Sequence, residues 1–68
     1  MELKSIVAYK LKQIKSERKL TKKQIAAFTG LSYREIGKIE REEVSITLDT
    51  LQKLAVGLNI TVAELVSE

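Results

Sequence analysis

The 68-residue sequence contains no cysteine, no histidine and no proline, and it has only three glycines and three aromatic residues. Without cysteine or histidine it can form neither a disulfide nor a zinc site built from Cys and His ligands. Nucleophilic and general acid–base catalysis also lack candidates, because no serine or threonine is paired with a plausible base. We therefore expect a protein that is not an enzyme and that depends almost entirely on its hydrophobic core for stability.

Long apolar runs are also missing. No run reaches the roughly 18 residues that a transmembrane helix needs, and the first ten residues, MELKSIVAYK, lack the apolar centre of a signal peptide. With 44% apolar and 31% charged residues, the composition is that of a globular protein. We expect one soluble, cytoplasmic domain over residues 1–68, with no metal, cofactor or small-molecule ligand.

The two signs of charge are separated along the chain. Met1 to Arg41 holds eleven Lys and Arg against four Glu, a net +7, whereas Glu42 to Glu68 holds one Lys against five acids, a net −4. A basic segment of this kind suits an anionic partner, although a merely solvated surface has the same composition.

Helical periodicity runs through the whole sequence, and no segment alternates as a strand would. Leu3, Val7, Leu11 and Ile14 form one apolar stripe, which predicts a helix from about Leu3 to Arg18.

Further helix starts are marked by capping residues. Capping boxes pair Thr21 with Gln24, Ser32 with Glu35, and Thr61 with Glu64, and Thr47 is a suitable N-cap for a helix that ends near Asn59. The sequence therefore predicts an all-α fold of five helices with short connections.

Two of these starts, Thr21 and Ser32, lie unusually close together. Gly30 between them can adopt a positive φ and redirect the chain, so that a helix from Lys22 to Phe28 is followed by another from Tyr33. This pattern is typical of a helix-turn-helix over residues 21–40. An ordinary corner in a helical bundle would use the same glycine and stays open as an alternative.

The outer face of the helix that starts at Tyr33 favours nucleic acid. At 100° per residue, an arc of about 140° is shared by Tyr33, Arg34, Gly37 and Lys38. Arg and Lys match the acceptors of guanine in the major groove, and Tyr can contact a thymine methyl or a phosphate. Glycine costs about 1 kcal/mol inside a helix, so Gly37 indicates close approach by DNA or by another backbone.

The sequence resembles the lambda-repressor and Cro-type helix-turn-helix family, also called the XRE family, from Leu11 to Val66. The matching positions are Leu20, Thr21, Ile25, Ala26, Gly30, Leu31, Ser32, Ile36, Ile39 and Glu40, and the segment TLDTLQKLAVGLNITVAELV is similar to the family's fourth and fifth helices. The resemblance implies a five-helix, lambda-repressor-like domain. It also implies a bacterial or phage transcriptional regulator, most often a repressor, that binds double-stranded operator DNA as a homodimer.

The same resemblance assigns roles to individual residues. Base contacts would come from Tyr33, Arg34 and Lys38, and phosphate contacts from Thr21, Lys22, Ser32 and Arg41. Lys22 stands where the family often has Gln, so we expect its phosphate contact to be kept and its support of a recognition side chain to be absent. Glu42 and Glu43 place acid near the expected DNA backbone.

Three further expectations concern packing. A partly buried ion pair between Lys15 and Glu40 is expected to link the first and third helices, as matching positions of the family often do. Phe28 is expected to be buried in the core. A homodimer interface is expected at the C-terminal end, where more apolar side chains gather than a short helix can bury, namely Leu58, Ile60, Val62, Leu65 and Val66.

Another class of function uses the same fold. A small adaptor, antirepressor or antitoxin could bind a protein through Phe28, Tyr33 and Gly37. Membrane binding by the basic first helix is a weaker alternative, because its apolar stripe is needed for the core.

Overall fold

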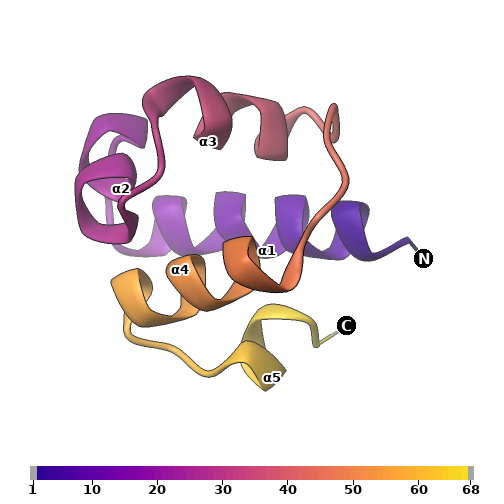
Figure 1. Ribbon diagram of the computed structural model, residues 1–68. Coiled ribbons are helices and arrows are strands. Elements are labelled where there is room, and N and C mark those ends of the chain that lie inside the picture. Colours follow the sequence, from indigo (N-terminus) through magenta and orange to yellow (C-terminus); the bar gives the residue numbers. More distant parts are fainter. Residues whose placement is uncertain (1, 68) are drawn as a thin grey trace.

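The five helices expected from the sequence are present in the computed structural model, which describes residues 2–67. They are α1 (Leu3–Glu17), α2 (Lys22–Thr29), α3 (Tyr33–Glu40), α4 (Leu48–Leu58) and α5 (Val62–Leu65). No strand occurs between residues 2 and 67, so the all-α prediction is confirmed. Figure 1 shows α1 crossing the middle of the molecule, with α3 on one side of it and α4 and α5 on the other. Within the same residues, no helix is both long and apolar enough to span a bilayer.

Local side-chain chemistry sets where the helices begin. The hydroxyls of Thr21, Ser32 and Thr61 each accept a hydrogen bond from the backbone N–H three residues later, and the Gln or Glu at that position bonds back to the N-cap amide. Thr47 accepts from the N–H of Thr50 in the same way. Each of these bonds satisfies a donor that the helix itself leaves free, so the predicted starts are confirmed.

The helix ends depend on residues with left-handed backbone. Gly30 has φ 78° and Asn59 has φ 57°, as the sequence predicts. Lys19 (φ 55°) and Glu42 (φ 60°) adopt the same left-handed conformation, although neither residue type favours it. α1 ends at Glu17, with Arg18 as its C-cap, just before the left-handed Lys19. α2 ends at Thr29, one residue beyond the predicted Phe28, just before the left-handed Gly30.

The core draws apolar side chains from all five helices. It consists of Val7, Leu11, Ile14, Ile25, Leu31, Ile36, Ile39, Leu51, Leu54, Leu58 and Leu65. Leu58 is 1% exposed and Leu65 is 0% exposed, so the expectation that these two form a dimer interface is wrong. The short α5 packs against both α1 and α4, and this contact closes the monomer over them. Ile60, Val62 and Val66 are only partly buried and retain some accessible surface.

A close helix crossing holds the helix-turn-helix against the rest of the fold. Gly57 of α4 lies under the C-terminal end of α2, where a Cβ would meet the carbonyl oxygen of Phe28 at 2.5 Å and the Cα of Thr29 at 2.7 Å. Both atoms belong to the backbone and cannot move aside without shifting α2. The sequence contains this glycine but gives no sign of which element approaches it.

Replacing Gly57 with Ala separates two opposing effects. Helix propensity alone predicts a gain of about 1 kcal/mol, whereas overpacking against backbone predicts a loss of roughly 1 to 3 kcal/mol. We expect the loss to dominate in urea unfolding. Val56→Ala, at the adjacent and largely exposed position, is the control and should change stability by less than about 0.5 kcal/mol. A Gly57→Ala protein more stable than the wild type would show that α2 and α4 do not approach this closely.

Candidate nucleic-acid interface

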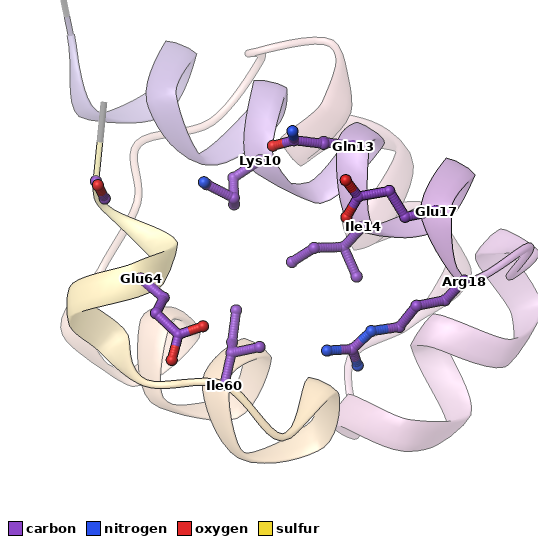
Figure 2. Close-up of a pocket in the computed structure, with 8 residues that line it drawn as sticks. Lys10, Gln13, Ile14, Glu17, Arg18, Ile60 and Glu64 are labelled. Carbon is purple, nitrogen blue, oxygen red and sulfur yellow. The ribbon is translucent and has the colours of Figure 1, made fainter.

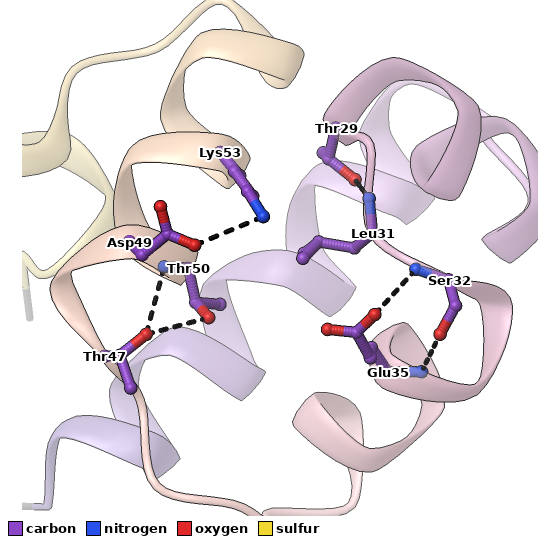
Figure 3. A network of polar contacts seen from close by, with 8 residues as sticks. All are labelled: Thr29, Leu31, Ser32, Glu35, Thr47, Asp49, Thr50 and Lys53. Carbon is purple, nitrogen blue, oxygen red and sulfur yellow. Dashed lines mark hydrogen bonds and ion pairs between the residues drawn. The ribbon is translucent and has the colours of Figure 1, made fainter.

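The turn between α2 and α3 is fixed by a threonine as well as by Gly30. Thr29 donates its hydroxyl to the carbonyl of Ile25 at 2.7 Å. The same hydroxyl accepts from the N–H of Leu31 at 3.3 Å, as Figure 3 shows. Leu31 itself is buried in the core. The three residues after α2 therefore have little freedom, and α3 leaves the turn in one direction.

One face of α3 is anchored and the opposite face is open. Ile36 and Ile39 are buried, whereas Tyr33 is 54% exposed and Arg34 is also exposed. Lys38 lies at the edge of the open face and is partly covered. The structure thus brings the three predicted base-contacting side chains onto one accessible surface, which we call the outer face of α3.

Glu40 connects α3 to both α1 and α2. Its carboxylate is 6% exposed, and Lys15 Nζ of α1 lies 2.8 Å from Oε2, which is the expected ion pair. Lys22 Nζ of α2 lies 3.6 Å from Oε1 of the same group. Oε2 accepts no hydrogen bond from any group in residues 2–67, and Lys15 is its ion-pair partner there.

Lys22 has a second neighbour that the sequence does not predict. Its ammonium lies 5.7 Å from the centroid of the Tyr33 ring, within the range of a cation–π contact. Lys22 therefore lies between the buried Glu40 and a side chain of the outer face. No hydrogen bond joins Lys22 to a recognition side chain in residues 2–67, so lysine at this position can act on Tyr33 only through its charge.

The helix N-termini differ from the expected phosphate sites in one respect. The N–H of Thr21 donates to Gln24 Oε1 at 2.9 Å, and the N–H of Ser32 donates to Glu35 Oε1 at 3.1 Å. Those two amides are thus already occupied by the capping boxes, and Glu35 adds a negative charge at the start of α3. The amides that remain for an anion belong to the first helical residues, such as Lys22 and Lys23, which have no acceptor within the helix.

Arg41 does not extend away from the end of α3. Its Nε donates to Glu43 Oε2 at 3.0 Å, and its guanidinium lies over Gly37. The hydrogen bond and the charge of Glu43 raise the pKa of Arg41, and the same bond lowers the pKa of Glu43. Glu42 is engaged as well, because it accepts a 2.6 Å hydrogen bond from the hydroxyl of Ser5. Both acids after α3 therefore have partners.

Phe28 is not part of the core. Its side chain is 54% exposed at the C-terminal end of α2, which contradicts the expected burial. The reason is the tight crossing at Gly57, which presses the backbone of Phe28 and Thr29 against α4 and turns the ring outward.

Comparison with known proteins agrees with this geometry. Residues 11–65 match the helix-turn-helix family. The chain is 36% identical over 67 residues to the control protein C.SmaI of Serratia marcescens, which covers 98% of this chain and 80% of that protein. It is 39% identical over 62 residues to the immunity repressor protein of Bacillus phage phi105, covering 91% of this chain and 43% of that one. This chain belongs to the helix-turn-helix family.

A solved structure extends the comparison. The crystal structure of an HTH_3 family transcriptional regulator from Vibrio cholerae matches with a TM-score of 0.87 and 38% identity, over 93% of this chain and 35% of that one. The chain spans most of the control protein but less than half of the phage repressor and of the Vibrio regulator. These relatives are named as a control protein, an immunity repressor protein and a transcriptional regulator, and together with the helix-turn-helix match they identify this chain as a DNA-binding transcriptional regulator.

The Glu40 cluster of this helix-turn-helix protein can be tested by stability measurements. Glu40→Ala leaves Lys15 and Lys22 facing each other without an anion, and we expect a loss of roughly 1 to 3 kcal/mol, below the value for a deeply buried pair because both lysines are partly exposed. Glu40→Gln keeps the shape and should lose less. Glu43→Ala, which removes an exposed acid, should stay within about 0.5 kcal/mol. An unchanged melting temperature for Glu40→Ala would show that the ion pair is not structural.

Proposed function

We propose that this helix-turn-helix protein regulates transcription by inserting the outer face of α3 into the major groove of operator DNA. The observation that carries the proposal is the exposure of Tyr33 and Arg34 on a helix whose opposite side is locked into the core by Ile36 and Ile39. In this docking, α2 crosses the DNA backbone while α3 reads base edges. The protein acts in the bacterial cytoplasm by binding and not by catalysis, and repression is the outcome named for the phage relative.

Base reading and phosphate binding fall to different side chains. Arg34 has the donor geometry for guanine O6 and N7, Tyr33 suits a thymine methyl, and Lys38 reaches either a base or a phosphate. The start of α2 suits a phosphate, because it contributes both the charge of Lys22 and the free amides of Lys22 and Lys23. The Lys22 charge is only partly offset by Glu40, since that carboxylate is shared with Lys15.

We further propose that the protein binds as a homodimer through its C-terminal end. Ile60, Val62 and Val66 keep accessible apolar surface after Leu58 and Leu65 are withdrawn into the core. Ile60 also lines a groove of about 300 Å³ between α1 and α5, shown in Figure 2 with Ile14 opposite it and Lys10, Glu17, Arg18 and Glu64 around it. A symmetric pair joined there would present two α3 helices to half-sites about 34 Å apart.

A protein-binding adaptor remains the second candidate, and the exposed Phe28 favours it. In that case the partner would cover Phe28 together with Tyr33. The two functions differ in their response to salt, because DNA binding releases condensed counterions and weakens steeply as salt is added.

Replacing Arg34 and replacing Lys22 should have different effects on DNA binding. Arg34→Ala should lose about 1 to 3 kcal/mol on the preferred sequence and little on random duplex DNA. Lys22→Ala should weaken both nearly equally and reduce the slope of log affinity against log salt by about one for each phosphate that is no longer neutralised. Fluorescence anisotropy over a salt series measures both effects, with the exposed Lys12→Ala as the control. A uniform loss for Arg34→Ala would make Arg34 a backbone contact, and loss of protein binding with intact DNA binding would support the adaptor.

The dimer prediction is tested by sedimentation velocity at micromolar concentration, with and without duplex DNA. We expect the wild type to associate and Val62→Glu to shift toward monomer, because a charge would then enter the interface. Val56→Glu places the same charge on the exposed side of α4, where Val56 is 82% exposed, and should not change the association. Monomer under every condition would exclude the dimer, and dissociation by Val56→Glu alone would move the interface to α4.

A further inference from the structure

Arg41 lies on the outer face of α3, although it follows the last residue of that helix. Its φ of −90° and ψ of 2° keep it close to the helical path. Counting about 100° per residue, Arg41 falls roughly 80° from Tyr33, between Gly37 and Arg34 in projection. Long side chains on a helix lean toward its N-terminus, so Arg41 covers the turn that precedes it.

Gly37 provides the space that this position of Arg41 requires. A Cβ on Gly37 would lie 3.0 Å from Nη1 of Arg41 and 3.7 Å from both Cζ and Nη2. Gly37 is buried although it belongs to the exposed face, because the guanidinium rests on it. The guanidinium of Arg41 thus occupies the space that the missing side chain of Gly37 leaves open.

Glu43 pairs with the guanidinium, and the two side chains are 51% and 54% exposed. It accepts the Nε–H of Arg41 at 3.0 Å, which leaves the two terminal NH₂ groups of the guanidinium available. An arginine that binds phosphate would be weakened by a carboxylate at this distance, because the carboxylate repels the phosphate. A G·C base pair is different, since Arg matches guanine O6 and N7 while Glu matches the amino group of cytosine.

The folded position of the Arg41 side chain also moves its charge along α3, toward the start of the helix. By turning back over Gly37, the side chain carries its guanidinium about one helical turn, roughly 5 Å, toward the N-terminal half of α3. That half is the part of a recognition helix that contacts bases.

We propose that Arg41 is a specificity-determining residue that reads a guanine in the major groove, with Gly37 as its seat and Glu43 as its positioning residue. The inference rests on the proposed DNA-binding function and replaces the phosphate contact that the sequence analysis expects of Arg41.

The first test selects bound sequences from a pool of random duplexes and compares wild type with Arg41→Ala, Arg34→Ala and the control Lys12→Ala. We expect Arg41→Ala to lose its preference for guanine at one position of each half-site and to bind the wild-type sequence about 5- to 150-fold more weakly. Arg34→Ala should lose preference at a different position, and Lys12→Ala at none. An equal loss on all sequences, or an unchanged preference, would overturn the assignment of Arg41.

The second test examines the roles of Gly37 and Glu43. Gly37→Ala should weaken binding to the selected duplex several-fold when Arg41 is present and by less than about twofold in the Arg41→Ala background, because only a displaced guanidinium couples the two sites. In that background it should also raise the melting temperature by about 4 to 8 °C, since Ala is the better helix former. Glu43→Gln, which keeps the shape, should weaken the guanine preference without lowering the melting temperature. If Gly37→Ala weakened DNA binding equally in both backgrounds, Gly37 would not act by making room for the Arg41 guanidinium.

The outcomes separate this inference from the function on which it rests. If the wild type selects a sequence and Arg34→Ala changes it while Arg41→Ala does not, only the role of Arg41 is wrong. If the wild type selects no sequence at all, both the inference and the proposed function fail.

Discussion

The buried carboxylate of Glu40 is the charged interaction that ties α3 to both α1 and α2. Apolar packing and the turn at Thr29 and Gly30 already set the course of α3. Glu40 adds to this packing, because one group on α3 is paired with Lys15 of α1 and approached by Lys22 of α2. Lys22 in turn lies beside the Tyr33 ring. A charge in the interior is therefore connected, through a single lysine, to the surface that we propose contacts DNA.

Local features of the fold could be predicted from the sequence. The capping boxes at Thr21, Ser32 and Thr61, and the left-handed residues Gly30 and Asn59, act within a few residues of themselves, so their effect does not depend on the rest of the chain. The open face of α3 follows from helical periodicity alone. The Lys15–Glu40 pair follows only from the family resemblance, because nothing local links residues in different helices.

Features set by tertiary packing could not be predicted in the same way. The exposure of Phe28 follows from the crossing at Gly57, and the burial of Leu58 and Leu65 follows from the way α5 closes over α1 and α4. The position of Arg41 needs the structure for a similar reason: the sequence shows a glycine at position 37 but not the guanidinium that rests on it. Each of these features depends on elements that contact each other in the folded protein, and no pattern in the sequence indicates those contacts.

NMR titration of the labelled protein with a duplex selected from random DNA is the most direct test of whether α3 and the start of α2 form the DNA-binding surface. We expect the largest shifts at the amides of Lys22, Tyr33 and Arg34 and at the side-chain Nε–H of Arg41. Shifts confined to Phe28 and the exposed side of α4, with the resonances of α3 unchanged, would contradict this prediction.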